Sequence, residues 1–198
     1  LFCDVAVVGG GPAGLQAARV AADAGADTIL IDDEPRVGGS LLYERTPNGR
    51  TPTLTTDGIS VLSNAVCTGL FADNWLAVVQ GDRLFKLRAR EVVLATGTVE
   101  QPMVFRNNDL PGVILASAAQ RCMRLWGIKP GRRAVVVTAN EAGYGAAMDL
   151  LQAGVAVAAV CDLRQEGSPG GLADDVAARG IEVRKSWTVT EALPGRAG

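Results

Sequence analysis

Histidine is absent from the 198 residues. This absence excludes imidazole as a general base, a proton shuttle or a metal ligand. The four cysteines, Cys3, Cys67, Cys122 and Cys161, lie far apart, and no C-x-x-C pair occurs that could bind zinc or form a redox disulfide. We therefore expect structural thiols and no metal site.

An excess of charge and long apolar runs are also missing. The chain has 19 basic and 21 acidic residues, so no large positive field favours a nucleic-acid partner. No apolar stretch reaches the roughly 18–20 residues that cross a bilayer. The first residues lack the basic and small-residue signals of a secretory leader, so we expect a cytoplasmic protein. With 48% apolar residues, the composition predicts a compact core.

The first 31 residues carry a strand–helix–strand pattern. Residues 4–8 form a short apolar run that ends in three glycines, which is typical of a strand buried on both faces. Pro12 opens an alanine-rich helix that ends near Gly25, and residues 28–31 form a second buried strand. This βαβ unit predicts a parallel sheet.

The remaining chain alternates in the same way. The polar segment 43–58 lacks a helical pattern; either this connection is irregular or residues of the natural chain are missing. We expect strands at 59–65, 76–79, 84–89, 91–97, 134–138, 155–161 and 181–183, and helices at 116–126, 142–153 and 172–179.

A spaced glycine pattern lies between the first strand and the first helix. Gly9, Gly11 and Gly14 form the pattern G-x-G-x-x-G at the start of that helix. In such a turn the first glycine permits the tight turn and the second lets a pyrophosphate approach the backbone, while the third allows close helix–strand packing. The free N–H groups at the helix start attract the phosphate charge. The pattern therefore indicates a Rossmann-like α/β, three-layer FAD/NAD(P)-binding fold, with a dinucleotide-binding domain at 1–110 and a second βαβ unit at 111–198.

An acid after the second strand is expected to bind the ribose hydroxyls. Asp32 and Asp33 compete for this role; we favour Asp33, which lies 19 residues beyond Gly14. Considered alone, Glu34 has the character of a solvated loop residue. A carboxylate here repels a 2′-phosphate, so we expect NAD or FAD rather than NADP.

Several ordered motifs carry a family resemblance. The segments 7–15, 33–39 and 94–97 resemble the two-dinucleotide-binding flavoprotein superfamily. More narrowly, the segments 38–42, 95–102, 104–113 and 115–117 resemble the alpha subunit of heterotetrameric sarcosine oxidase. The resemblance covers essentially the whole chain, in order.

The resemblance implies a role within an oxidoreductase complex. In that family a beta subunit holds the flavins and abstracts hydride from sarcosine or a related secondary amine, while the alpha subunit binds NAD and carries a folate-binding domain. That domain does not fit within 198 residues, so we expect a cofactor-binding portion with no catalytic residue of its own and with flavin-carrying partner subunits. The cofactor is expected to be NAD, with FAD as the alternative. The implied site residues are Gly9, Gly11, Pro12, Ala13, Gly14, Asp33, Glu34, Gly39, Ser40, Thr96 and Gly97, with the Val66 backbone near the adenine.

Departures from the family pattern keep alternatives open. In the second βαβ unit Thr138 and Asn140 replace the first two glycines and Glu141 adds a negative charge, so we expect that unit to be mostly structural, although Asp162 stands where a ribose acid would. We expect Tyr144 to be a packing residue and Lys185 to be solvated. The alternatives are a subunit of a proline dehydrogenase, an opine oxidase or a cyanide-forming glycine oxidase, or a purely structural NAD-binding module.

Overall fold

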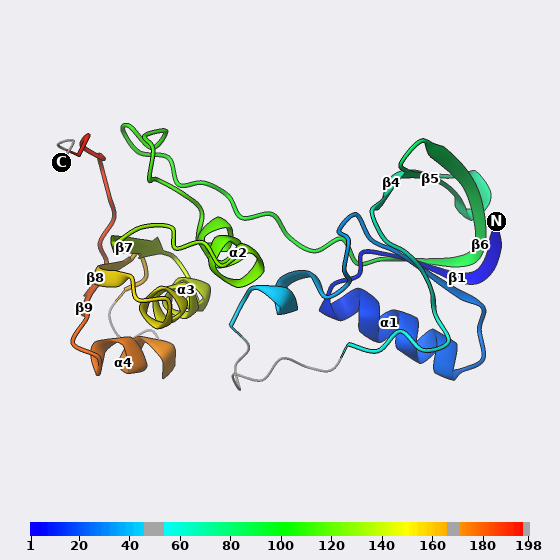
Figure 1. Cartoon of the computed structure of the whole chain (residues 1–198), viewed down its shortest axis with the longest axis horizontal. Coiled ribbons are helices and arrows are strands. Elements are labelled where there is room, and N and C mark those ends of the chain that lie inside the picture. Colours follow the sequence, from blue (N-terminus) through cyan, green and yellow to red (C-terminus); the bar gives the residue numbers. More distant parts are fainter. Residues whose placement is uncertain (46–53, 166–170, 196–198) are drawn as a thin grey trace. The chain divides into compact units, whose positions relative to one another are not determined.

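The computed structural model describes residues 1–45, 54–165 and 171–195, in two compact units. The N-terminal unit comprises residues 1–42 and 54–99, and the C-terminal unit comprises residues 43–45 and 100–195, apart from 166–170 (Figure 1). The N-terminal unit thus ends at Val99, whereas the predicted first domain ends at residue 110. Residues 46–53 of the expected irregular connection lie outside the described residues.

The N-terminal unit is built on one mixed sheet with the strand order β3-β2-β1-β6-β5-β4. Strands β3, β2, β1 and β6 pair in parallel, whereas β5 pairs antiparallel with both β6 and β4. The elements are β1 (Phe2–Val8), α1 (Pro12–Asp23), β2 (Thr28–Ile31), the 3-10 turn η1 (Gly39–Leu42), β3 (Ser60–Leu62), β4 (Ala65–Phe71), η2 (Ala72–Asn74), β5 (Trp75–Gln80) and β6 (Arg83–Leu94).

Two cores cover the two faces of this sheet, because side chains alternate along each strand. Val7 and Leu30 pack against Leu15 and Ala18 of α1 on one face. On the other face a second cluster joins the strands β1 and β2 to β4, β5 and β6; its buried members are Cys3, Ala6, Val8, Ile29, Ile31, Ala65, Leu76, Val78, Leu87 and Ala89. The predicted parallel α/β fold is confirmed.

The chain is divided into strands differently from the sequence prediction in two places. The expected strand 59–65 is divided, because Asn64 has a left-handed φ of 50° between β3 and β4. The expected strands 84–89 and 91–97 are one long strand, β6, which pairs with β5 at its start and with β1 at its end. Thr96 and Gly97 follow that strand.

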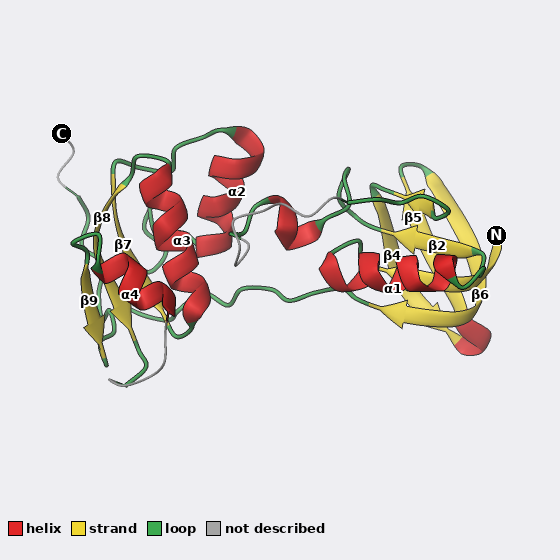
Figure 2. Cartoon of the chain, turned by 90° about the horizontal axis from the view of Figure 1, so that it is seen from below, coloured by secondary structure: helices red, strands yellow, loops and turns green. Residues whose placement is uncertain are grey.

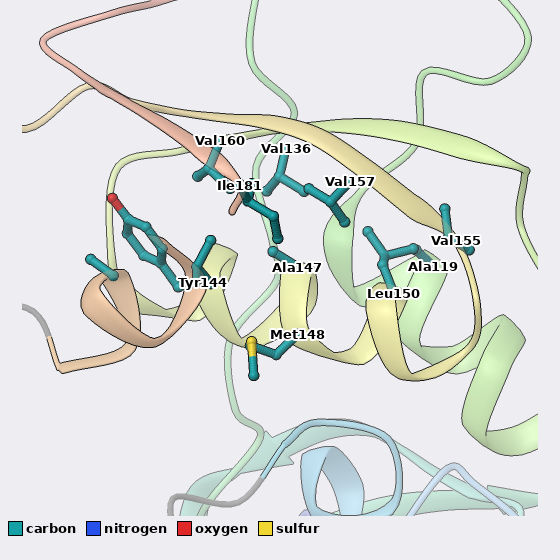
Figure 3. Close-up of a cluster of buried hydrophobic side chains, with 12 residues drawn as sticks. Ala119, Val136, Tyr144, Ala147, Met148, Leu150, Val155, Val157, Val160 and Ile181 are labelled. Carbon is teal, nitrogen blue, oxygen red and sulfur yellow. The ribbon is translucent and has the colours of Figure 1, made fainter. Parts of the chain in front are cut away.

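The C-terminal unit repeats the strand–helix–strand plan with three parallel strands in the order β7-β8-β9. Its elements are α2 (Ala116–Trp126), β7 (Arg133–Thr138), α3 (Glu141–Gln152), β8 (Ala156–Asp162), α4 (Gly171–Ala177) and β9 (Glu182–Lys185). Helix α3 packs on β7 and β8, and α2 and α4 both contact α3 (Figure 2). Figure 3 shows Tyr144, Ala147 and Leu150 of α3 directed at the strands.

The two surfaces of the three-stranded sheet differ. One carries the core that includes Val136 and Val160, whereas Val135 on β7 is 55% exposed. Among the strands that the structure describes, β7 pairs only with β8 and is therefore an edge strand. No helix in the described ranges is both long enough and apolar enough to span a bilayer.

Candidate functional site

The carboxyl ends of the parallel strands in the N-terminal unit meet at one edge of its sheet. The backbone there is tied together: the N–H of Gly9 donates to the Ile31 carbonyl (2.8 Å) and that of Ala95 to the Val8 carbonyl (2.8 Å). In open parallel sheets, ligands bind outside this edge.

Gly9 and Gly14 are required by close packing. Gly9 has a φ of +103°, which favours glycine, and an added Cβ would overlap the Ala95 carbonyl. A Cβ on Gly14 would overlap the backbone oxygen of Gly9. The helix start is therefore pressed against the strand, as the pattern predicted.

Gly11 has a different environment. It is the N-cap of α1, with no side-chain cap, and Pro12 follows as the first helical residue. Its φ of −73° suits any residue, and a Cβ there would have no atom within 4 Å. Neither conformation nor packing therefore requires a glycine here, and its side-chain position faces open space at the start of a helix. Uncapped helix starts of this kind are typical anion-binding positions in proteins.

The loop after β2 closes on the same turn. The N–H of Gly38 donates to the Gly10 carbonyl (2.7 Å), and a Cβ on Gly39 would lie 2.9 Å from the Gly11 Cα. Ser40 is half-buried in the following 3-10 turn. Gly39 therefore lies against Gly11, and Ser40 follows it in the chain.

The two candidate acids have different surroundings. Asp32 is buried, and its carboxylate accepts hydrogen bonds from the backbone N–H groups of Gly10 and Glu34, the latter at 2.9 Å. Asp33 is exposed. The buried acid thus links the glycine turn to the loop, and the choice of Asp33 as the ribose acid stays a prediction.

The remaining predicted residues lie around this edge. Ala65 donates its N–H to the Asp32 carbonyl (2.9 Å), which places the next residue, the half-exposed Val66, beside the acidic loop. The Thr96 Cα would be 3.2 Å from a Cβ on Gly9, and Gly97 borders open space. Pro12, Ala13 and Gly97 are exposed, and Glu34 is half-buried.

Sequence reasoning missed two contributors, Gly10 and Ala95. A Cβ on Gly10 would meet the Asp32 carboxylate at 2.7 Å, so this glycine lets the acid reach the turn. The available signal was the uninterrupted run Gly9–Gly11 followed by an acid at the strand end. The Ala95 carbonyl lies against Gly9, which the sequence pattern does not encode.

In the C-terminal unit the acid after the second strand is enclosed. Asp162 is fully buried, and Tyr144 donates its hydroxyl to it at 2.7 Å. The packing role of Tyr144 is confirmed. The expectation that Lys185 is solvated is wrong, because its ammonium pairs with Asp162 at 2.8 Å and its side chain is only 16% exposed.

The described cysteines have no disulfide partner. Burial, with added repulsion from Asp27, raises the pKa of the Cys3 thiol to about 11. A thiol with so high a pKa stays protonated and unreactive at neutral pH. Within the described ranges, histidine, cysteine, aspartate and glutamate form no group of three or more that could hold a metal ion.

Comparison with known proteins identifies the family of the chain. Residues 4–105 match the family of FAD dependent oxidoreductases, and the chain belongs to this family. It is 35% identical over 187 residues to the alpha subunit of sarcosine oxidase from Rhizobium meliloti (strain 1021), a match that covers 82% of this chain and 19% of that protein. It is 30% identical over 195 residues to an opine oxidase subunit from Agrobacterium tumefaciens (strain Ach5), covering 86% and 39%.

A solved structure, L-proline dehydrogenase from P. horikoshii, superposes with a TM-score of 0.71 at 29% identity, covering 85% of this chain and 37% of that one. The predicted resemblance to sarcosine oxidase alpha subunits and the Rossmann-type fold are therefore confirmed. The chain spans about a fifth of the length of the sarcosine oxidase subunits and about two fifths of the opine oxidase subunit.

Proposed function

We propose that the N-terminal unit binds the ADP portion that NAD and FAD share, as the cofactor-binding part of a multisubunit oxidase of sarcosine or another secondary amine. Gly11 carries this proposal. It borders open space at the start of α1, while Gly9 and Gly14 on either side have none. Membership of an FAD dependent oxidoreductase family supports flavin or dinucleotide binding in general.

In this function each residue type has a defined task. The free backbone N–H groups at the start of α1 would hold the pyrophosphate, and an acid after β2 would hold the ribose hydroxyls. The bound cofactor supplies the redox chemistry. The chain itself would bind and orient the cofactor, and flavin-carrying partner subunits would oxidise the amine.

A set of Gly11 variants tests the site. Calorimetric titration of the chain with NAD, FAD and ADP-ribose should give binding that Gly11→Ala weakens and Gly11→Trp abolishes. Gly131→Trp is the matched control, since Gly131 is an exposed glycine of the C-terminal unit without positive φ. Unchanged affinity in Gly11→Trp would place the ligand elsewhere.

The same titration separates the two cofactors. ADP-ribose measures the shared part of the site, and a large additional gain from FAD or from NAD identifies the ligand. NAD is our first choice and FAD the alternative. We further expect no sarcosine oxidation by the 198-residue chain alone, and turnover without added subunits would overturn the division of labour.

Opine oxidase is a second candidate assembly, because a subunit of that enzyme matches over 86% of the chain. Both candidate assemblies would use the same cofactor site, and they differ in the amine substrate that is oxidised. Assays of the complex purified from its native host with sarcosine and with an opine distinguish them.

A further inference from the structure

The two βαβ units correspond residue by residue. Val8 pairs with Ile31 across β1 and β2, and Val137 pairs with Cys161 across β7 and β8. The residues that follow in the C-terminal unit, Thr138, Asn140, Gly143 and Asp162, therefore stand where the N-terminal unit has Gly9, Gly11, Gly14 and Asp32. A Cβ on Gly143 would overlap the Thr138 side chain, just as one on Gly14 would overlap Gly9.

At the start of α3 the chain supplies its own hydrogen-bonding groups. The Asn140 side chain accepts a hydrogen bond from the Ala142 N–H at 3.0 Å. The Thr138 hydroxyl accepts from the Asn140 N–H (3.2 Å) and donates to the Asn140 carbonyl (2.9 Å). The N–H groups that are free at Gly11 of the other unit are thus engaged here, and side chains fill the turn.

The start of α3 also carries a negative side chain of its own, which is paired with an arginine. Glu141, the first residue of α3, forms an ion pair with Arg164 at 2.8 Å. Arg164 reaches from the loop after β8 and also contacts the Asp162 carboxylate, through Nε at 3.1 Å and through its terminal nitrogen at 2.9 Å. One guanidinium therefore connects the helix start to the acid that ends β8.

No acceptor position on Asp162 is left for a ribose. Its oxygens receive hydrogen bonds from the Tyr144 hydroxyl, the Lys185 ammonium, the Arg164 guanidinium and the Arg164 backbone N–H. A carboxylate offers about four lone-pair sites. Asp32, in contrast, accepts from two backbone N–H groups, those of Gly10 and Glu34.

We propose that the C-terminal βαβ unit is a dinucleotide-type site closed by its own side chains, with Arg164 bridging the positions that phosphate and ribose occupy in such sites, so that the chain holds a single dinucleotide. The count of one rests on the proposed function of the N-terminal unit. The closure of the C-terminal unit rests on the contacts among its own side chains and does not depend on the N-terminal unit.

Stoichiometry tests the closure. Equilibrium dialysis with ADP-ribose, NAD and FAD would be run on the wild-type chain, Gly11→Trp and Asn140→Trp, with circular dichroism to verify folding. We expect one ligand per wild-type chain, none for Gly11→Trp and one for Asn140→Trp. Two ligands per wild-type chain, with one in each variant, would overturn the closure and leave the proposed function intact.

The other outcomes are equally decisive. Binding that survives Gly11→Trp but is lost in Asn140→Trp would overturn both proposals, because the ligand would lie in the C-terminal unit. No binding by any of the three proteins would contradict the proposed function and still agree with a closed C-terminal unit.

A spectroscopic measurement checks the same point independently of affinity. In the NMR spectrum of the chain, the Arg164 Nε–H resonance should keep its position when NAD, FAD or ADP-ribose is added to saturation, because Asp162 and Glu141 hold the guanidinium. A ligand-dependent shift of that resonance in the Gly11→Trp variant would overturn the closure.

Discussion

The two βαβ units share one backbone arrangement but differ in the groups that surround the helix start and the acid after the second strand. At Gly11 the N-terminal unit leaves the helix start bare, and its buried Asp32 is tied to backbone N–H groups. At Asn140 the C-terminal unit caps its helix with a side chain, and Asp162 is enclosed by cationic and hydroxyl groups. Of the two glycines that close packing requires in the N-terminal unit, only Gly14 has a glycine counterpart, Gly143. Thr138 replaces Gly9, and Asn140 replaces Gly11, the glycine that packing does not require.

The largest effect is expected where the helix presses on the strand. Gly14→Ala places a methyl group on the backbone oxygen of Gly9, which cannot move aside, and should destabilise the N-terminal unit by about 4 kcal/mol or more. Gly11→Ala should change stability by less than about 0.5 kcal/mol. Chemical denaturation of both variants provides the measurement, and equal losses would refute the distinction between the two glycines.

The corresponding substitution in the C-terminal unit sharpens the comparison. Gly143→Ala overlaps the side chain of Thr138, not its backbone. Adding Thr138→Gly should therefore recover part of the loss, on the order of 1 kcal/mol of coupling in a double-mutant cycle. Strict additivity would show that the Thr138 side chain does not cause the crowding.

The acids that end the second strand of each unit should also differ in their contribution to stability. Asp162→Asn removes the charge that compensates Arg164 and Lys185, and we expect a loss of about 3 kcal/mol in the unfolding free energy of the C-terminal unit. Asp32→Asn, whose partners are uncharged N–H groups, should cost about 1–2 kcal/mol. Urea titrations measure the unfolding free energy of both variants. A larger loss for Asp32→Asn than for Asp162→Asn would contradict the stronger electrostatic role given to Asp162.

Tyr144→Phe deletes one hydrogen bond to Asp162 and should cost about 1.5 kcal/mol at neutral pH. Burial and then Asp162 raise the pKa of the Tyr144 hydroxyl above its ordinary value. The folded state then holds this proton more tightly than the unfolded state, so wild-type stability should fall as the pH rises above about 10.

This alkaline loss should be smaller in Tyr144→Phe than in the wild type. It should not vanish, because the pKa of Lys185 is also raised, chiefly by its hydrogen bond to Asp162, and its contribution is lost in the same direction. Unfolding free energies at about pH 8 and about pH 10.5, on either side of the ordinary phenol pKa, provide the test. Identical slopes in both proteins would contradict the role given to the phenol.

The last comparison concerns ligand affinity at the open site and not stability. Asp33→Asn should weaken ADP-ribose binding about tenfold, which corresponds to about 1.4 kcal/mol, and leave stability unchanged because Asp33 is exposed. Calorimetry is the readout. If Asp32→Asn weakens binding and Asp33→Asn does not, the ribose acid is Asp32, the counterpart of Asp162.

The periodicity of the sequence predicted most of this fold, because buried parallel strands and amphipathic helices carry strong local signals. Strand β2 and helix α2 have the predicted bounds. The division at Asn64 was not predictable, since a left-handed residue between two apolar runs has no signal in hydrophobicity. The continuity of β6 was missed because polar residues alternate along it.

The candidate site shows the same limit. The glycine spacing predicted the turn, and the substitutions at Thr138 and Asn140 predicted that the second turn is obstructed. Local sequence could not show that Lys185 meets Asp162, because this contact depends on the register in which β9 pairs beside β8. Long-range pairing of this kind is a tertiary property.

The exposed valine on β7 has a practical consequence for work with this polypeptide. Edge strands with uncharged, β-branched residues are templates for pairing with other molecules, and β7 reads Arg-Ala-Val-Val-Val-Thr with Val135 at the surface. Concentrated preparations should therefore self-associate through this strand. A lysine introduced in place of Val135 would act as a gatekeeper that keeps the purified protein dispersed.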